Sequence, residues 1–273
     1  MGDVYRSGCG AELVLRVVTL NCNGIRSVLR KDNFAFLTSL LPDIVCLQET
    51  KAQLFSLPPE VGPLATFHSA FVDAVRPGYS GVAIISRRRP DHIVRGMGDV
   101  EFDNEGRYVQ MDFGNCSVVS VYAPSGTSGD VRQTVKNRFM TVFERKLAAM
   151  AKSGRDVIIC GDLNVAHREI DVHDPRSCSR FSGFLPHERV WIDRLFTEYG
   201  WIDAFRAIDA NAERYSWWTY RAGAFQNNKG WRIDYQLASP GLAGRITDAK
   251  IFPEPRLSDH AAVCVDYNLA WDV

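Results

Sequence analysis

The chain has 273 residues, of which 46% are hydrophobic and 23% charged, a composition typical of a globular protein with one large or two small domains. Lys and Arg together number 32, as do Asp and Glu, and this zero net charge neither supports nor excludes nucleic-acid binding, which depends on local charge. No apolar run approaches about 18 residues, which excludes a transmembrane helix, and the N-terminus lacks the apolar stretch of a signal peptide.

In chain order, the first half is dominated by predicted strands. Apolar and β-branched runs predict strands at 13–20, 43–49, 81–86 and 107–113, with a helix at 31–41. Residues 116–126 are predicted to be a strand that runs into a Pro/Gly turn.

The second half contains the clearest helices. Apolar residues at helical spacing predict a helix over 131–151, and another helix follows Pro186. Strands are predicted at 156–162, 215–220, 231–238, 245–252 and 261–267. Strands outnumber helices and few are separated by a helix alone, which favours a layered α/β fold with mixed sheets. We expect a flexible tail at 1–12 and a single domain at 13–273.

The cysteines indicate the redox state of the protein. There are seven, an odd number, and they form no C-x-x-C pair. Cys46, Cys116, Cys160 and Cys264 lie within apolar runs, where cysteine behaves as a small buried hydrophobe. We therefore expect reduced, buried thiols and a cytosolic protein.

Polar residues repeatedly stand where predicted strands end or begin. They are Asn21, Asn23, Glu49, Tyr122, Asp162, Asn164, Asp259 and His260, and a further acid, Asp234, lies within the predicted strand 231–238. Each alone is more simply a turn former, a helix cap or a structural partner. Strand ends on one edge of a layered α/β protein face a common crevice, however, and several carboxylates brought together there need a cation. Hard oxygen ligands favour Mg²⁺, so the set as a whole predicts metal-assisted phosphoester hydrolysis.

One stretch, Gly161-Asp162-Leu163-Asn164, illustrates the pattern. On an extended backbone, alternate side chains point to opposite sides. We therefore expect Asp162 and Asn164 to share one side and Leu163 to face the core.

The set also resembles the exonuclease III family of apurinic/apyrimidinic (AP) endonucleases, in the DNase I-like endonuclease/exonuclease/phosphatase superfamily. The matching segments follow the family's order over roughly residues 13–267: LNCNGIRS, DIVCLQETK, GYSGVAIISR, EGRYVQMDFG, VYAPSG, GDLNVAHREID, GWRIDYQLAS and LSDHAAV. The resemblance implies a four-layered α/β sandwich, in which two mixed β-sheets pack face to face with helices outside and the site lies at one end.

The resemblance also implies residue roles at the metal. Glu49 would be the principal Mg²⁺ ligand and Asp259 a further ligand or its neighbour. Asn21 and Asn23 would help to build the metal and phosphate site. Many relatives have Asp at the second of these positions, so Asn23 is expected to weaken metal binding there.

Further roles concern the reacting groups. By resemblance, Asp162 would orient or deprotonate the attacking water, and Asn164 would hold that water or a phosphate oxygen. Asp234 would fix the imidazole of His260, which donates to the phosphate. Tyr122 would contact the phosphate or assist the leaving oxygen. Whether one or two metals act is left open by the sequence.

Recognition of an abasic site needs a pocket that accepts an extrahelical sugar without a base. By resemblance, Trp217, Trp231 and Ile233 would line it, and Arg221 would enter the DNA groove from the loop 221–230. Because strand alternation places neighbouring side chains on opposite faces, we expect Trp218 to be turned inward. Basic residues that could contact the DNA backbone are Arg76, residues 87–89, Lys136, Arg138, Arg176, Arg180 and Lys229.

The expected function is therefore a Mg²⁺-dependent DNA-repair phosphodiesterase, with Mn²⁺ as an acceptable substitute. It would act as a monomer on double-stranded DNA with abasic sites or blocked 3′ ends, incise 5′ to the lesion, and have 3′-phosphodiesterase, 3′-phosphatase and 3′→5′ exonuclease activity. The alternatives are an enzyme that mainly processes 3′ ends, a phosphatase of inositol phosphates or lipids, and a DNA-binding module with a dead site. No membrane partner is expected.

Overall fold

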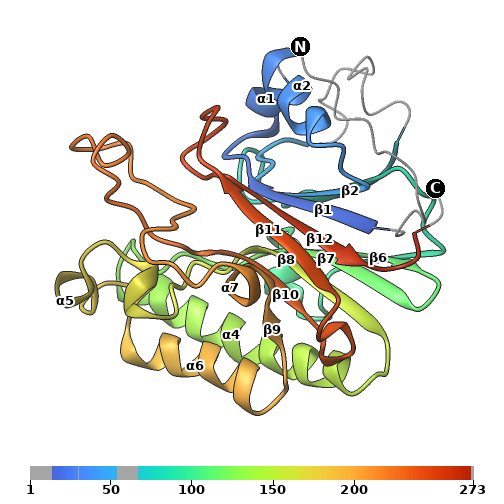
Figure 1. Cartoon of the computed structure of the whole chain (residues 1–273). Helices are drawn as coiled ribbons and strands as arrows, with labels where there is room; N and C mark the ends of the chain where they lie inside the picture. Colours follow the sequence, from blue (N-terminus) through green and yellow to red (C-terminus); the bar gives the residue numbers. More distant parts are fainter. Residues whose placement is uncertain (1–13, 30, 54–66, 272–273) are drawn as a thin grey trace.

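In the computed structural model, which describes residues 14–29, 31–53 and 67–271, two six-stranded sheets pack between two layers of helices (Figure 1). The predicted tail at 1–12 lies outside the described residues. The first sheet has the order β11 (Ile246–Phe252), β12 (Ala262–Asn268), β1 (Val14–Asn21), β2 (Ile44–Gln48), β4 (Val82–Ser86), β3 (His68–Val72). The second has the order β5 (His92–Arg95), β6 (Tyr108–Phe113), β7 (Cys116–Tyr122), β8 (Asp156–Asp162), β10 (Asp234–Ala238), β9 (Ile202–Asp203).

Both sheets are mixed. The pairs β1–β2 and β7–β8 are parallel, and the other pairs are antiparallel. The α-helices of the described residues are α1 (Ile25–Val28), α2 (Lys31–Ser39), α3 (Val100–Asn104), α4 (Asp130–Ala151), α5 (Pro175–Cys178), α6 (Pro186–Thr197) and α7 (Ala204–Ile208). Short 3₁₀ helices occupy Glu169–Asp171 and Pro240–Leu242. The four-layered sandwich expected from the sequence is confirmed.

Central strands of the two sheets contribute to two hydrophobic layers, because successive side chains point to opposite faces. Ile158 of β8 packs in the core between the sheets, whereas its neighbour Ile159 packs against the side covered by α4 and α6. A third cluster lies beneath α1 and α2. Figure 1 shows α1 and α2 above the first sheet and α4 and α6 below the second. The four cysteines predicted to be buried thiols are free and buried.

Two strand predictions in the last third are wrong in extent. Residues 215–220 form no strand: Trp217 makes only isolated bridges, to Trp231 and to His260. The strand predicted at 231–238 begins only at Asp234, because the backbone of Trp231 pairs with Trp217 and Val172 rather than with a neighbouring strand. The aromatic, β-branched composition of these segments therefore serves local packing instead of a regular ladder.

The sequence also failed to predict the edge strands β3 and β5. All four residues of β5 are exposed or half-buried, and the strand lacks the apolar run that identifies a central strand. Among the described residues, no helix has both the length and the hydrophobicity needed to cross a bilayer.

The strand ends bring the candidate residues to one edge of the sandwich. In the first sheet, β1 ends at Asn21 and its parallel neighbour β2 ends beside Glu49. In the second sheet, β7 ends at Tyr122 and β8 at Asp162, and Asp162 pairs directly with Asp234 at the start of antiparallel β10. The two sheets therefore meet at this edge with one group of polar side chains from each.

Candidate active site

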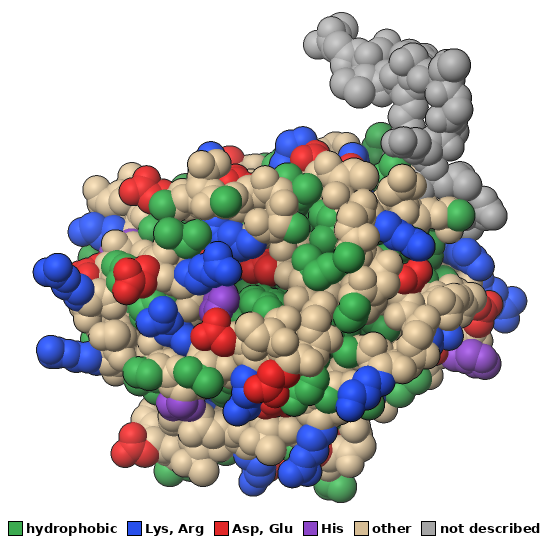
Figure 2. All heavy atoms as spheres, turned by 60° about the horizontal axis from the view of Figure 1, so that its bottom comes forward, with side chains coloured by type: hydrophobic (Ala, Val, Ile, Leu, Met, Phe, Trp, Pro, Cys, Tyr) green, Lys and Arg blue, Asp and Glu red, His purple; other side chains and the backbone are tan. Residues whose placement is uncertain are grey.

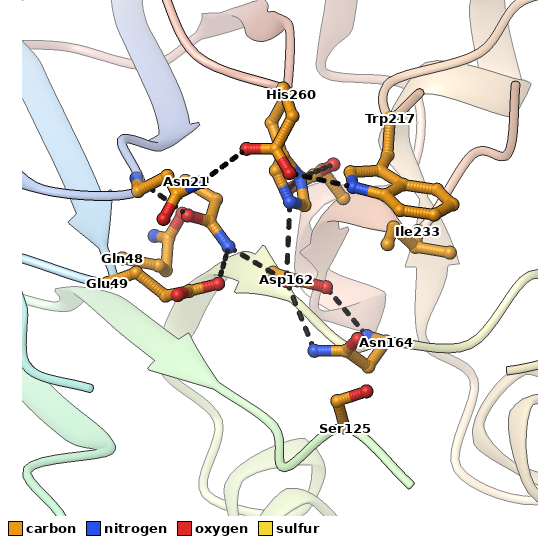
Figure 3. Close-up of polar contacts among 12 residues, drawn as sticks. Asn21, Gln48, Glu49, Ser125, Asp162, Asn164, Trp217, Ile233 and His260 are labelled. Atoms are coloured by element: carbon orange, nitrogen blue, oxygen red, sulfur yellow. Dashed lines mark hydrogen bonds and ion pairs between the residues drawn. The ribbon is translucent and has the colours of Figure 1, made fainter. Parts of the chain in front are cut away.

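Asp162 lies at the centre of the polar cluster (Figure 3). Its Oδ2 accepts hydrogen bonds from Nδ2 of Asn21 at 2.9 Å and from Nδ2 of Asn164 at 3.1 Å. Nε2 of His260 lies 3.9 Å from the same oxygen. Residues from both sheets thus converge on one carboxylate.

The backbone at the end of β8 explains how Asp162 reaches this position. Gly161 is needed because a Cβ there would lie 1.9 Å from the carbonyl oxygen of Val121 on the neighbouring strand. Leu163 is buried with the apolar side chains beneath α4, as expected. Asn164 is not extended, however, and has a left-handed φ of 53°. Its backbone N–H donates to Oδ1 of Asp162 at 2.8 Å, so a turn, not strand alternation, brings Asn164 to the side of Asp162.

The electrostatic environment of Asp162 disfavours its charge. Burial is the largest cause, followed by repulsion from Asp234 and Glu49, and together these raise the pKa of Asp162 to about 7 although His260 opposes the shift. A carboxyl group that titrates near neutral pH is a competent proton acceptor.

His260 and Asp234 form a buried pair. Nδ1 of His260 contacts Oδ2 of Asp234 at 2.9 Å, and the hydroxyl of Ser216 donates to that same oxygen at 2.6 Å. Burial opposes protonation of the imidazole, but Asp234 and then Asp162 outweigh it and raise the pKa of His260 to about 10. At neutral pH the imidazolium therefore presents Nε2–H toward Asp162. Ser216 was missed by the sequence reasoning, because a serine within the aromatic run YSWWTY carries no signal of its own.

Glu49 stands between an amide and a cation. Its Oε1 accepts from Asn21 at 2.7 Å, and its Oε2 lies 2.7 Å from Nζ of Lys51. Burial alone would raise the pKa of Glu49, but Lys51 and Asn21 outweigh burial and lower it. The sequence predicted no role for Lys51 either, although it stands two positions after Glu49 in the segment DIVCLQETK.

Asn23 and Asp259 lie next to this pair. Nδ2 of Asn23 donates to Oδ1 of Asp259 at 2.9 Å, and Oδ1 of Asn23 accepts from Lys51. The other oxygen of Asp259 accepts from the indole N–H of Trp217 at 3.2 Å. Both carboxylate oxygens of Asp259 thus already accept hydrogen bonds, one from Asn23 and one from Trp217. Asn23 itself adds no charge to the cluster.

The donor set fits a hard divalent cation. Glu49, Asp162 and His260 each offer one atom, and these atoms lie within 4.8 Å of one another. Nδ1 of His260 is already held by Asp234 at 2.9 Å, which leaves Nε2 as the ring atom that faces the cluster. The carboxylate oxygens of Glu49 and Asp162 are hard ligands, of the kind that a hard divalent cation prefers.

Tyr122 lies beside these acids at the end of β7. Burial, then the charges of Glu49 and Asp162, raise its pKa well above the ordinary value. The guanidinium of Arg107 lies 4.8 Å from the centre of its ring. Tyr122 therefore remains a neutral hydroxyl that can donate a hydrogen bond.

A cavity of about 690 Å³ opens onto the cluster and includes Glu49, Tyr122, Asp162, Asn164, Asp259 and His260 in its lining. Trp217, Trp231 and Ile233 form an apolar wall, and Figure 3 shows Trp217 and Ile233 on one side of Asp162. Trp218 is buried elsewhere, against Tyr215 and Phe225. Ser125, Thr127 and Ser182 also line the cavity and were not predicted.

The basic residues expected to contact DNA are distributed unequally. Arg221 and Lys229 line the cavity and are exposed, and Arg176 and Arg180 are exposed on and just after α5. On the face shown in Figure 2, Lys and Arg side chains are scattered among acidic ones rather than forming one continuous basic surface.

The other basic residues expected to contact DNA do not line the cavity. Arg138 is paired with Glu101, and the guanidinium of Arg76 lies 5.6 Å from the centre of the Tyr79 ring. Residues 87–89 follow the end of β4 that pairs with the start of β2, so they stand at the opposite edge of the sheet from Glu49. The expectation for Lys136 is wrong: it is fully buried and paired with Glu188, so it is inaccessible to DNA.

Comparisons with known proteins agree with this geometry. The model of the endonuclease/exonuclease/phosphatase family matches residues 18–260. An exodeoxyribonuclease of Bacillus subtilis is 38% identical over 93% of this chain and 100% of its own length. An AP endonuclease structure from Archaeoglobus fulgidus has a TM-score of 0.85 and 30% identity, covering 93% of this chain and 100% of that one. A 3′–5′ exonuclease structure from Neisseria meningitidis has a TM-score of 0.85 and 25% identity, with the same coverages.

Proposed function

Because the chain belongs to the endonuclease/exonuclease/phosphatase family, we propose that it is a Mg²⁺-dependent DNA-repair phosphodiesterase that incises 5′ to abasic sites and leaves a 3′-hydroxyl. The observation that carries the proposal is the arrangement around Asp162. A carboxyl with a pKa of about 7 faces a protonated imidazole at 3.9 Å, on the floor of a cavity with an aromatic wall. A proton acceptor and a cationic donor thus face the same small volume.

Asp162 is proposed to hold the attacking water and accept its proton. The water oxygen forms a bond to phosphorus in line with the bond to the 3′ oxygen of the upstream nucleotide. That bond breaks, and the 3′ oxygen leaves with the electron pair and takes a proton from solvent to become the 3′-hydroxyl. Asn21 and Asn164 donate to Oδ2 of Asp162, and the Asn164 backbone donates to Oδ1, so the carboxylate has one orientation. Such positioning by fixed donors lowers the barrier without reorganisation during the reaction.

His260 is proposed to donate from Nε2 to a phosphoryl oxygen. Its Nδ1–H donates to Asp234, and this contact fixes the orientation of the ring. Asp234 is itself held by a hydrogen bond from the hydroxyl of Ser216. The neutral hydroxyl of Tyr122 is a second donor on the floor of the cavity. Both donors are aimed at the region where negative charge increases in the transition state.

Glu49 is the proposed principal ligand of Mg²⁺, with Asp259 and the amides of Asn21 and Asn23 around it. When bound, the cation neutralises charge on the phosphoryl and leaving oxygens. Lys51 already pairs with Oε2 of Glu49. We therefore expect metal and Lys51 to compete for that carboxylate, and Mn²⁺ to substitute because it accepts the same oxygen ligands.

The proposed substrate is double-stranded DNA bound by a monomer. The wall formed by Trp217, Trp231 and Ile233 supports a site for an extrahelical sugar without a base, because it offers apolar surface and few hydrogen bonds. Arg221 and Lys229 are the proposed contacts to the DNA backbone on one side of the cavity, with Arg180 on a separate segment.

A second candidate is an enzyme that mainly removes 3′ phosphates or trims 3′ ends. It is favoured by one observation: the chain resembles a solved AP endonuclease and a solved 3′–5′ exonuclease with the same TM-score of 0.85. The two activities use the same phosphodiester chemistry and differ in which DNA end or lesion the cavity accepts.

The test is a comparison of three duplexes, which carry an abasic analogue, a 3′-phosphate, or an undamaged recessed 3′ end. We expect Mg²⁺-dependent cleavage of the abasic duplex to be fastest, and EDTA to abolish all three activities. Fastest turnover of the 3′-phosphate would favour the second candidate. No metal-dependent cleavage of any duplex would exclude both.

A further inference from the structure

A second buried charge pair lies directly behind the active site. Lys136 on α4 and Glu188 on α6 are both fully buried, and Nζ of Lys136 lies 2.6 Å from Oε1 of Glu188. Neither side chain lines the cavity, so neither can touch a substrate in this structure. A buried ion pair is by itself weak evidence for a stabilising role, because desolvation offsets most of the attraction. The remaining contacts of the pair are therefore informative.

Lys136 reaches the turn that carries Asn164. Its Nζ donates to the carbonyl oxygen of Asn164 at 2.8 Å and to the hydroxyl of Ser182 at 3.3 Å. Asn164 has a φ of 53°, a left-handed conformation that a non-glycine residue keeps only when its surroundings hold it. The ammonium group of Lys136 thus holds the backbone of Asn164, the residue whose side chain contacts Asp162.

Glu188 holds the neighbouring wall of the cavity. Its Oε2 accepts from the backbone N–H of Gly183 at 2.7 Å and of Leu185 at 3.0 Å. Gly183 in turn accepts from the N–H of Ala166 at 2.7 Å. The segment 182–185 is therefore connected to the Asn164 turn twice, once through the ion pair and once through the backbone.

The surrounding packing leaves little room for displacement. A Cβ on Gly183 would lie 3.0 Å from the Asn164 carbonyl oxygen and 3.1 Å from the ring of Trp231. A Cβ on Gly126, in the loop that carries Ser125, would lie 2.4 Å from the hydroxyl of Ser182. A small shift of the 182–185 segment would therefore be transmitted to Asn164, to the aromatic wall and to the Ser125 loop.

We infer that Lys136 and Glu188 form a positioning pair, which holds the Asn164 turn and the 182–185 wall in register and thereby sets the orientation of the groups around Asp162. This inference rests on the proposed function, because the groups it orients are those assigned to the attacking water. Lys136 acts through Asn164 and Glu188 acts through Gly183, so neither is itself a catalytic residue. Their effect should appear in turnover more than in substrate binding.

The principal test uses the double variant Lys136→Met/Glu188→Gln on the full chain. It removes both charges and the donors to Asn164 but keeps side-chain volume and an acceptor for Gly183, so folding is expected to survive. We expect kcat on the abasic duplex to fall roughly 100-fold, as small misplacements of reacting groups do, with KM changed less than about threefold. The single variant Lys136→Arg keeps a positive charge and N–H donors at this position, so its kcat should stay within about tenfold of wild type.

A double-mutant cycle with Asn164→Ala separates positioning from a general structural effect. If the pair acts through Asn164, adding Lys136→Met/Glu188→Gln to Asn164→Ala should cost much less than it costs in the wild type. The inference would be overturned if the combined variant lost kcat by the full product of the two separate losses. A wild-type kcat in Lys136→Met/Glu188→Gln would also overturn it. The matched control is Lys152→Met, which removes an exposed lysine just after the end of the same helix and should leave kcat unchanged.

Two further measurements keep the inference separable from the proposed function. Wild-type protein that fails to cleave any duplex refutes the function, whereas wild-type cleavage with an additive cycle refutes only the positioning pair. Amide hydrogen exchange needs no activity: exchange should accelerate in residues 163–185 of the double variant, and unchanged exchange there would refute the inference. Should the double variant not fold, Gly183→Ala, which displaces the same wall, should lower kcat, and full turnover in that variant would refute the coupling.

Discussion

Two buried charge clusters in this protein differ in how their carboxylates are compensated. Around Asp171, Nε of Arg232 donates at 2.8 Å and Nη2 of Arg206 lies at 2.6 Å, and Nη2 of Arg232 also lies 2.7 Å from Asp203. Every acid of that cluster faces a guanidinium. Asp162, in contrast, accepts hydrogen bonds from two amides, and the imidazolium of His260 lies 3.9 Å away. Its other charged neighbours are the carboxylates of Asp234 and Glu49.

The difference appears in the pKa values. Burial would raise the pKa of both acids, but Arg232 and Arg206 reverse the effect and hold the pKa of Asp171 well below its usual range. At Asp162, burial and repulsion from Asp234 prevail and raise the pKa to about 7. The Asp171 cluster therefore ties the 3₁₀ helix Glu169–Asp171 to β9, to α7 and to the residues just before β10. The Asp162 carboxyl, in contrast, is left able to accept a proton or to contact a cation.

Asp162→Asn should produce the largest effect and the sharpest contrast. Loss of the proposed proton acceptor should lower kcat by roughly 100- to 10,000-fold, while DNA binding stays largely intact. The melting temperature should stay level or rise, because an uncompensated buried charge is removed. Cleavage rates, DNA-binding affinity and thermal unfolding measure these effects.

Asp156→Asn is the matched control, since Asp156 lies at the opposite end of β8. It should retain wild-type turnover. Wild-type turnover in Asp162→Asn would contradict the role of that carboxylate.

Arg232→Met should show the opposite behaviour and lower stability. It leaves Asp203 buried without its guanidinium and removes one of the two partners of Asp171, so the free energy of unfolding should fall by about 3–5 kcal/mol. Denaturant titration measures the loss. Arg214→Met breaks the exposed pair with Asp209 and should cost at most about 1 kcal/mol. Equal losses in the two variants would show that burial of the Arg232 pair has no special energetic role.

The pH dependence of stability should distinguish the cluster further. The pKa of Asp171 is depressed in the folded state, so its contribution to stability is present above its unfolded pKa of about 4 and is lost as pH falls toward the folded value. Asp171→Asn should therefore destabilise the protein clearly at pH 7 and progressively less as the pH is lowered below about 4. A destabilisation that is constant from pH 7 to pH 3 would contradict this account.

Asn23→Asp should give the smallest effect, which should appear in the affinity for the metal ion. It places a carboxylate beside Asp259 and Lys51, where Asn23 now contributes only an amide. Added ligand charge tightens divalent-cation binding, so the Mg²⁺ concentration for half-maximal cleavage should fall by about tenfold. An unchanged or higher requirement would mean that this position does not contribute to the metal site.

Much of the candidate site could be predicted because its residues end or begin strands. Strand periodicity is local, so Glu49, Tyr122 and Asp162 could be assigned to strand ends without knowing the fold, whereas Asp234 was expected inside a strand that in the structure begins at this residue. Their convergence followed from the general rule that strand ends on one edge face a crevice, and the family resemblance added their order.

The surroundings of these residues could not be predicted in the same way. Residues 215–220 have the composition of a strand, but their aromatic side chains pack locally and the backbone bridges to Trp231 and His260 instead. The buried Ser216 depends on Asp234, a partner 18 residues away in the sequence. The Asn164 turn and the Lys51–Glu49 pair depend on left-handed backbone angles at Asn164, Glu49 and Lys51, which no sequence pattern predicts.

Lys136 shows most clearly what the sequence alone determined and what the tertiary structure decided. The helical period from 131 to 151 fixed the helix, and a lysine on such a helix was expected to face solvent or DNA. The structure buries it against Glu188, which lies 52 residues later in the chain. Apolar periodicity determines which face of an element is buried, whereas the burial of a charge depends on whether the fold brings an opposite charge to it.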